Sequence, residues 1–154
     1  MANWPFTQGV HDIGNGVYGY VQPDGTWGWS NAGLVTSHGE TLLIDTLMSV
    51  PLTRNMLDDF AKVPGGARID KLVNTHANPD HFFGNGLVAD AEIIGAEKMR
   101  EEMATFNPKA LGSLRDNYQN MGESGAFLFE TMGRKFDFSG VDELTLPNRT
   151  FEGA

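Results

Sequence analysis

The apolar positions of the chain predict short strands that alternate with helices. Runs of consecutive or alternating apolar residues predict strands at residues 17–22, 32–36, 41–45, 69–74 and 91–95. A helix is expected over residues 50–63, where Leu52, Met56 and Phe60 recur at helical spacing, and a second helix follows the strand at 91–95. Alternation of strands and helices along a chain predicts an α/β fold.

Several strands are apolar on consecutive residues, which means that both faces of the sheet need cover. The segments 42–44 and 93–94 show this pattern most clearly. Helices can cover one face, but the pattern supplies nothing for the other, and the sequence stops at residue 154 without a helix or turn signal that would close the domain. We therefore expect a missing C-terminal half or a second copy of the chain to cover the exposed sheet face.

Charge and composition narrow the classes of partner. Of the ionisable side chains, 20 are acidic and 11 are basic, giving a net charge of −9. Because no basic cluster is available to neutralise phosphates, neither nucleic acid nor an anionic membrane is an expected partner. The chain has 0 cysteines, which excludes disulfides, thiolate metal sites and cysteine nucleophiles.

The chain also carries no sign of export or membrane insertion. Residues 1–6 lack the charged and apolar regions of a secretory signal. No apolar run reaches the roughly 20 residues that a membrane-spanning helix requires. A cytoplasmic protein is the expectation.

The densest cluster of metal-ligand side chains lies in residues 75–81, which read T-H-A-N-P-D-H directly after the strand predicted at 69–74. Sites in α/β sheets are usually found where strands end. The imidazoles of His76 and His81 and the carboxylate of Asp80 together suit Zn²⁺, Fe²⁺ or Mn²⁺. Because Asp80 and His81 are consecutive, their side chains diverge from one turn, and the segment can serve two neighbouring metal positions.

This segment resembles the metal motif of the metallo-β-lactamase superfamily, which is His-x-His-x-Asp-His after a strand, with threonine before it and glycine a few residues later. The matching residues are Thr75, His76, Asp80, His81 and Gly84. Upstream, segments 31–33 and 42–46 resemble the family's opening hairpin and its leucine-isoleucine-aspartate strand, so the resemblance covers roughly residues 10–100.

The resemblance implies the αββα sandwich of that superfamily, of which this chain would be about the N-terminal αβ half, a single domain over residues 1–154. That half is expected to be one mixed sheet with helices on one face. Residues 107–138 are predicted to be helical and are interpreted as a helical insertion. Insertions of this kind wall the substrate pocket in several branches of the family, and the alternative is a helix pair that covers the sheet.

Asn78 departs from the family pattern, which has its second motif histidine there. An amide oxygen is a weaker and harder ligand than imidazole, so we expect this position to bind zinc less well or to favour a harder metal. Asn78 followed by Pro79 is also a good helix start, so capping alone and weak ligation remain alternatives. The family implies one or two zinc ions, with iron or manganese left open.

The resemblance implies hydrolysis by a metal-activated water, with metal ligation by His76 and His81. Asp80 would both ligate the metal and orient, or accept a proton from, the attacking water. A small ester, lactone or thioester is the expected small-molecule substrate. The family's remaining ligands belong to a C-terminal half, so the isolated chain is expected to be weak or inactive.

Three further residues are candidates around the site. Asp45 corresponds to an aspartate that holds the motif loop in the family, and the alternative role is to accept backbone N–H bonds in the adjacent turn. Trp27 and Trp29 lie in a loop that overhangs the metal in family members, where they would clamp an apolar substrate or pack against the sheet.

Two other functions are weighed against a hydrolase. A non-catalytic scaffold or binding module that self-associates is suggested by Asn78 and by the absent ligands. Redox chemistry at non-haem iron occurs in the superfamily, and nothing in the sequence prefers it.

Overall fold

A computed structural model describes residues 7–141 and 143–153. It contains one seven-stranded sheet whose spatial order follows chain order. The strands are β1 (Gly9–Gly14), β2 (Val17–Val21), β3 (Ala32–Ser37), β4 (Glu40–Ile44), β5 (Lys71–Val73), β6 (Glu92–Ala96) and β7 (Arg149–Phe151). Strands β1 to β4 pair antiparallel, whereas β4 to β7 pair parallel. This mixed sheet with helices confirms the predicted α/β class.

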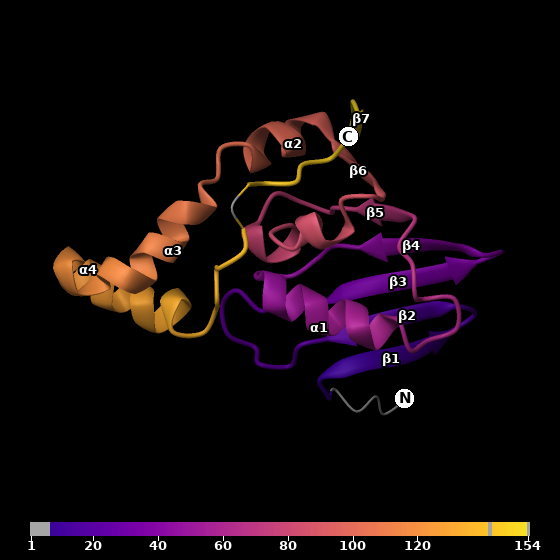
Figure 1. Ribbon diagram of the computed structural model, residues 1–154, viewed down its shortest axis with the longest axis horizontal. Coiled ribbons are helices and arrows are strands. Elements are labelled where there is room, and N and C mark those ends of the chain that lie inside the picture. Colours follow the sequence, from indigo (N-terminus) through magenta and orange to yellow (C-terminus); the bar gives the residue numbers. More distant parts are fainter. Residues whose placement is uncertain (1–6, 142, 154) are drawn as a thin grey trace.

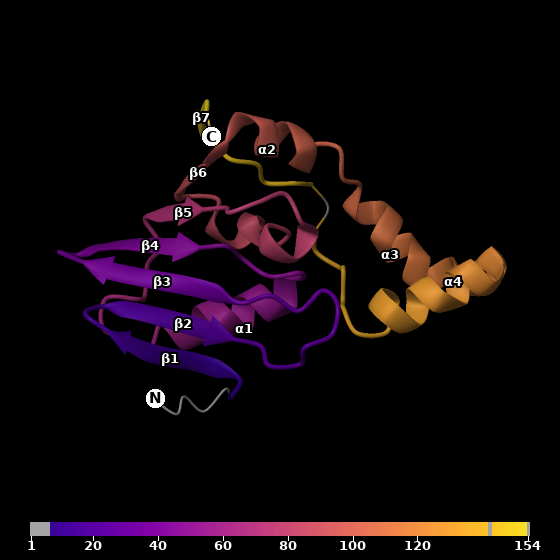
Figure 2. The same cartoon turned by 180° about the vertical axis from the view of Figure 1, so that it is seen from behind.

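The longer helices are α1 (Val50–Phe60), α2 (Glu97–Met103), α3 (Pro108–Asn117) and α4 (Gly122–Leu128). Shorter helical segments are η1 (Pro79–His81), η2 (Asn85–Val88), η3 (Tyr118–Met121) and the π-helical η4 (Phe129–Gly133). Helix α1 makes the crossover between parallel strands β4 and β5 and lies on one face of the sheet (Figure 1). Seen from behind, strands β1 to β4 are in front, and no helix of the described residues lies over them (Figure 2).

Helix α1 begins where the sequence pattern predicted. The Ser49 side chain accepts a hydrogen bond from the backbone N–H of Leu52, and Pro51 occupies the first turn, where its missing N–H removes no helical bond. Met56 and Phe60 on the inner face are fully buried against the sheet. The helix ends at Phe60, three residues before the predicted end, and residues 61–66 continue as turns.

The two faces of the sheet have different environments. On the face that α1 covers, Leu34, Leu43 and Leu72 lie opposite one another on β3, β4 and β5, and all three are fully buried. On the other face, Ile44 and Val73 lie side by side and are only half-buried. Because successive side chains of a strand point to opposite faces of the sheet, an apolar row remains on the uncovered face, as the consecutive apolar residues in the strands predicted.

Strand β1 was missed by the sequence analysis. It pairs with β2 at the edge of the sheet, with a register irregularity between Asp12 and Gly14. Only Val10 and Ile13 are strongly apolar in this strand, and Ile13 remains exposed. An edge strand with so little burial has too weak an alternation to be detected from sequence.

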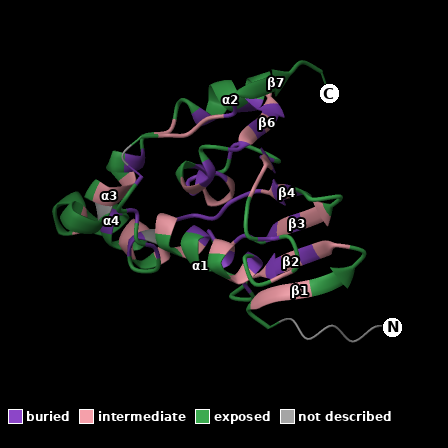
Figure 3. Ribbon diagram, turned by 45° about the vertical axis from the view of Figure 1, so that its right-hand side comes forward, coloured by how far each residue is buried: buried purple, intermediate pink, exposed green. Residues whose placement is uncertain are grey.

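Helices α3 and α4 occupy the region predicted to be helical at 107–138. They form an arm that projects from the sheet, and most of their surface is exposed (Figure 3). The chain returns from this arm through Phe136 and Phe138, which are buried in a second apolar cluster with Phe82 and Met103. The arm is thus attached to the domain chiefly by the segment that follows it.

No helix of the described residues combines the length and the apolar character needed to cross a membrane. The expectation that the N-terminus is not a secretory signal concerns residues 1–6, which lie outside the described range.

Gly84 allows the motif segment to approach α1, and its replacement provides a test of this packing. A Cβ atom at Gly84 would overlap the side chain of Thr53, which is fully buried in α1. We expect Gly84→Ala to lower the free energy of unfolding by about 1–3 kcal/mol through overpacking, measured by urea denaturation. Gly86→Ala is the matched control, because its nearest contact would be an ordinary 3.5 Å to Thr145. Equal stability of the two variants would contradict this packing.

Candidate metal centre

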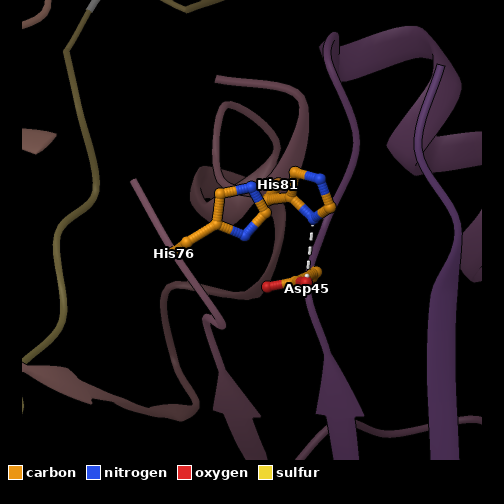
Figure 4. Close-up of side chains that lie close together, drawn as sticks. All are labelled: Asp45, His76 and His81. Carbon is orange, nitrogen blue, oxygen red and sulfur yellow. Dashed lines mark hydrogen bonds and ion pairs between the residues drawn. The ribbon is translucent and has the colours of Figure 1, made fainter. Parts of the chain in front are cut away.

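The candidate site lies where parallel strands β4 and β5 end. Asp45 directly follows β4, and His76 lies three residues beyond Val73, the last residue of β5. The backbone N–H of Asp45 donates to the carbonyl of Val73 at 2.9 Å, which keeps the two strand ends together. The loop then turns back through η1, so that His81 lies beside both residues (Figure 4). Adjacent strand ends therefore place three motif-related side chains at one point.

Asp45 accepts the hydrogen bonds that hold the motif loop. Its carboxylate is buried, and it accepts from the backbone N–H of Thr75 at 2.7 Å, from the Thr75 hydroxyl at 2.6 Å and from Nδ1 of His81 at 2.9 Å. The residue also adopts a φ of 60°, a left-handed conformation that aspartate tolerates better than most residues. The sequence offered two roles for Asp45, to support the motif loop or to accept a backbone N–H. The side chain makes both kinds of bond.

These hydrogen bonds determine which imidazole nitrogens remain free. Because an ionised Asp45 only accepts, Nδ1 of His81 carries the proton and its Nε2 has a free lone pair. The Thr75 hydroxyl has one proton, and it donates this proton to Asp45. In its 2.9 Å contact with His76 the hydroxyl oxygen is therefore the acceptor, and Nδ1 of His76 is the donor. Both rings therefore present Nε2, the nitrogen available to a metal.

Asp80 lies on the free side of His81. Its Oδ2 is 3.5 Å from Nε2 of His81, and the Ser30 hydroxyl donates to its backbone carbonyl. The rings of His76 and His81 have their centroids 4.0 Å apart. Two imidazoles and an acidic oxygen within this short range form a donor set that fits Zn²⁺ or a similar divalent cation.

Ligand-type atoms of Asp45, His76 and His81 all lie within 4.8 Å of one another. By distance alone, Asp45 would complete a metal-binding triad. However, its two oxygens already accept three hydrogen bonds from the motif loop. Asp45 is therefore occupied with the motif loop, whereas Oδ2 of Asp80 lies beside Nε2 of His81.

The pKa of His81 is raised above its ordinary value of 6.5. Burial of the ring acts in the opposite direction, because it disfavours the charged imidazolium. The hydrogen bond and the negative charge of Asp45, together with the charge of Asp80, outweigh burial and favour protonation. A metal ion would bind the neutral ring, in which Nδ1 carries the proton, so protonation of Nε2 would compete with metal binding there.

The remaining candidate residues are Asn78, Trp27 and Trp29. Asn78 occupies the N-cap position of η1 and is exposed, but its side chain makes no capping hydrogen bond among the described residues. The capping alternative therefore applies to its backbone position and not to its side chain. Trp27 is 57% exposed, whereas Trp29 is half-buried with its ring centroid 5.2 Å from that of Phe136. Thus Trp29 packs against the returning segment, and Trp27 is displayed.

Thr75 makes contacts at the candidate site that the sequence did not reveal. The resemblance marked it as a motif residue, but the bond of its hydroxyl to Asp45 requires that two separate segments of sequence meet. A hydroxyl directly before a candidate ligand is the one signal that could have indicated this role.

Comparisons with known proteins identify the family and the fold. The family model of the metallo-beta-lactamase superfamily matches residues 25–152. A search among curated proteins finds no match. In solved structures, the chain is similar to the metallo-beta-lactamase from Hirschia baltica, with 20% identity and a TM-score of 0.51 over 63% of this chain and 48% of that one.

Two further structures show the same fold. The metallo-beta-lactamase from Erythrobacter litoralis has 22% identity and a TM-score of 0.51, over 62% of this chain and 44% of that one. A double mutant of the sec-alkyl sulfatase PisA1 has 20% identity and a TM-score of 0.54, over 73% of this chain and 19% of that one. The chain thus spans about half the length of the two lactamases, 48% and 44%.

The pairing between Asp45 and His81 predicts a pH effect in the metal-free protein. We expect Asp45→Asn, which keeps the side-chain size and tolerates the left-handed backbone, to lower the pKa of His81, measured by NMR titration of its ring protons. The raised pKa contributes stability that is complete below the unfolded value and is lost as pH rises through the folded value. Urea denaturation of the wild type should show the free energy of unfolding falling over this pH range, and the fall should be smaller in Asp45→Asn.

An unchanged His81 curve in Asp45→Asn would contradict the assigned pairing.

Proposed function

Because this chain belongs to the metallo-beta-lactamase superfamily, we propose that it is a metal-dependent hydrolase whose centre uses His76, Asp80 and His81. The observation that carries the proposal is the proximity of His76 and His81, whose ligand-type atoms lie within 4.8 Å of each other, with Oδ2 of Asp80 at 3.5 Å from Nε2 of His81. Asp45 and Thr75 bind the Nδ1 side of the two rings, and Asp80 lies on the Nε2 side of His81. This arrangement leaves the nitrogens that metals prefer available beside a carboxylate.

The chain's own residues divide the work of hydrolysis. His76 and His81 would hold zinc, which when bound lowers the pKa of water and polarises the scissile group. The Asp80 carboxylate orients the attacking water and accepts its proton at Oδ2. Asp45 keeps His81 in the tautomer that ligation requires, and Thr75 does the same for His76. Asn78 supplies a weaker oxygen donor than a histidine in that position.

A small ester, lactone or thioester is the substrate class that we propose. A net charge of −9 disfavours polyanionic substrates such as nucleic acids. Trp27, displayed in the loop between β2 and β3, offers an apolar ring for the body of such a substrate. The resemblance to the superfamily implies that a complete centre takes further ligands from a C-terminal half. Weak activity of this chain alone is therefore part of the proposal.

A cytoplasmic location is also proposed.

Zinc content and hydrolysis by the full chain test the proposal together. We expect zinc to bind after dialysis against dilute zinc salt, and a panel of activated esters, lactones and thioesters to be hydrolysed slowly. Asp80→Ala should lower the rate by about 10²–10⁴-fold, because the proton acceptor and a ligand are both removed. A chelator should abolish the rate. Asp116→Ala, at an exposed position of α3, is the matched control.

Hydrolysis that is indifferent both to chelation and to Asp80→Ala would refute the hydrolase proposal. Zinc content distinguishes it from a non-catalytic role, because a scaffold would carry no stoichiometric metal. His76→Ala and His81→Ala should each lose bound zinc if these imidazoles are ligands.

A second candidate function, a non-catalytic scaffold that self-associates, is favoured by the uncovered sheet face. Val35 lies there between Val17 on β2 and Leu42 on β4, and all three are half-buried. Ile44, Val73 and Ile94 form a second row beside them. Contiguous apolar surface of this kind is rarely left in water. In this proposal, two copies bury the rows against each other and build a four-layer assembly.

Sedimentation velocity tests self-association directly. We expect the wild-type chain to sediment as a dimer at micromolar concentration. Val35→Lys should shift it towards monomer, because the charge would be buried unpaired in the interface. Gln119→Lys adds the same charge on the exposed arm and should leave the dimer intact. A folded wild-type monomer at high concentration would contradict this second function.

A further inference from the structure

A buried polar cluster behind the motif loop connects His81 to the C-terminal segment of the chain. We propose that Thr46, Asn74 and Asn85 are positioning residues, which fix the backbone of His81 and thereby its imidazole in the metal centre. Thr145 supports them from the far end of the chain. The inference rests on the proposed metal-binding function and adds residues that neither the motif nor the ligand geometry identified.

The backbone carbonyl of His81 is held by two strong hydrogen bonds. It accepts from the backbone N–H of Thr46 and from Nδ2 of Asn74, each at 2.9 Å. The Thr46 hydroxyl lies 3.4 Å from the same oxygen. Thr46 directly follows Asp45, and Asn74 directly precedes Thr75. The ends of β4 and β5, which orient the imidazoles, therefore also bind the backbone carbonyl of His81. The residue is therefore fixed both at its ring and at its carbonyl.

Asn85 organises the cluster from the centre. It is completely buried, and its Nδ2 donates to Oδ1 of Asn74 at 2.8 Å and to the carbonyl of Thr145 at 3.0 Å. Its Oδ1 accepts from the Thr46 hydroxyl at 3.0 Å and lies 3.3 Å from Nδ2 of Asn74. Both donors and the acceptor of the amide are used, so its orientation is unique. An amide is required, because neither a carboxylate nor an apolar group can make this set of bonds.

The bond to Thr145 extends the cluster to a segment 60 residues away in sequence. That segment is itself anchored to β6 by Asn148, whose backbone N–H donates to the carbonyl of Ile93 at 2.9 Å. The Asn148 side chain accepts from the N–H of Ile93 at 2.9 Å. Hydrogen bonds thus connect β6 to the C-terminal segment, and the C-terminal segment to Asn85 in the cluster that contacts His81.

A metal centre makes stricter demands on position than folding does. Ligating groups have to be held within about 0.5 Å of their working geometry, whereas a fold tolerates larger local shifts. His81 is followed by a turn with few helical bonds, so its position depends on the cluster beneath it. We therefore expect loss of the cluster to weaken metal binding beyond any loss of stability.

Isosteric variants separate these two effects. Asn85→Asp keeps the size and one acceptor oxygen, but it places an oxygen against the oxygens of Asn74 and Thr145. Asn74→Asp removes the donor to His81 in the same way. Zinc titration of the full chain by calorimetry, at a temperature where each variant is folded, should show affinity lowered by about 10–100-fold. Asn55→Asp, on the exposed face of α1, should bind zinc like the wild type.

The Thr46 hydroxyl provides a conservative rescue. Thr46→Val keeps the shape of the side chain but removes the donor to Asn85, so zinc affinity should fall. Thr46→Ser keeps the hydroxyl and should restore most of that affinity. If the two variants bound zinc equally, the hydroxyl would have no positioning role and the proposed cluster would lose one of its members.

Hydrogen exchange supplies a readout that does not need the metal. The backbone N–H of Thr46 is protected by the carbonyl of His81, so its exchange in Asn85→Asp should be faster than in the wild type. The N–H of Asp45, bonded to Val73, should keep its protection and is the internal control. If the wild type binds no zinc, the proposed metal site fails, and exchange at Thr46 still decides whether the cluster positions His81. Unchanged zinc affinity and unchanged exchange in a destabilised Asn85→Asp would overturn the inference.

Discussion

The site depends on one buried carboxylate that needs hydrogen-bond donors. Asp45 ends β4 in a left-handed conformation and is removed from water, where an unpartnered charge would cost several kcal/mol. Its donors come from Thr75 and His81, at the two ends of the motif loop. The loop cannot adopt another path without leaving this charge unsatisfied, so a local electrostatic requirement determines the shape of the motif segment.

The elements that the sequence predicted are those with strong burial. The sequence predicted strands β2 to β6 and helix α1 to within a few residues of their bounds. These strands contain strong apolar patterns, because residues such as Leu43 and Leu72 are buried in the core and their neighbours on the other face are half-buried. Strand β1 buries too little to give such a pattern. The end of α1 was placed too late, because Val63 continues the helical spacing while the chain has already turned.

The candidate site could be located from the sequence but not assembled from it. His76, Asp80 and His81 were identified by their chemistry and spacing, and the structure places the rings of His76 and His81 side by side with Asp80 next to His81. The orientation of the rings depends on Asp45 and Thr75, which lie 30 residues apart, and no local pattern encodes such a bond. Asn85 gave no signal at all, since a single asparagine in a turn is usually a surface residue. Its burial is visible only when the fold is known.

The order of the strands has a consequence for how the protein forms during synthesis. Each strand from β2 to β7 pairs with the one made just before it, so the sheet can grow in the direction of translation. The connection between β6 and β7 is the longest, because it contains the helical arm. The segment that supports Asn85 is consequently synthesised well after the motif loop, and this loop gains that support only once the helical arm has been made.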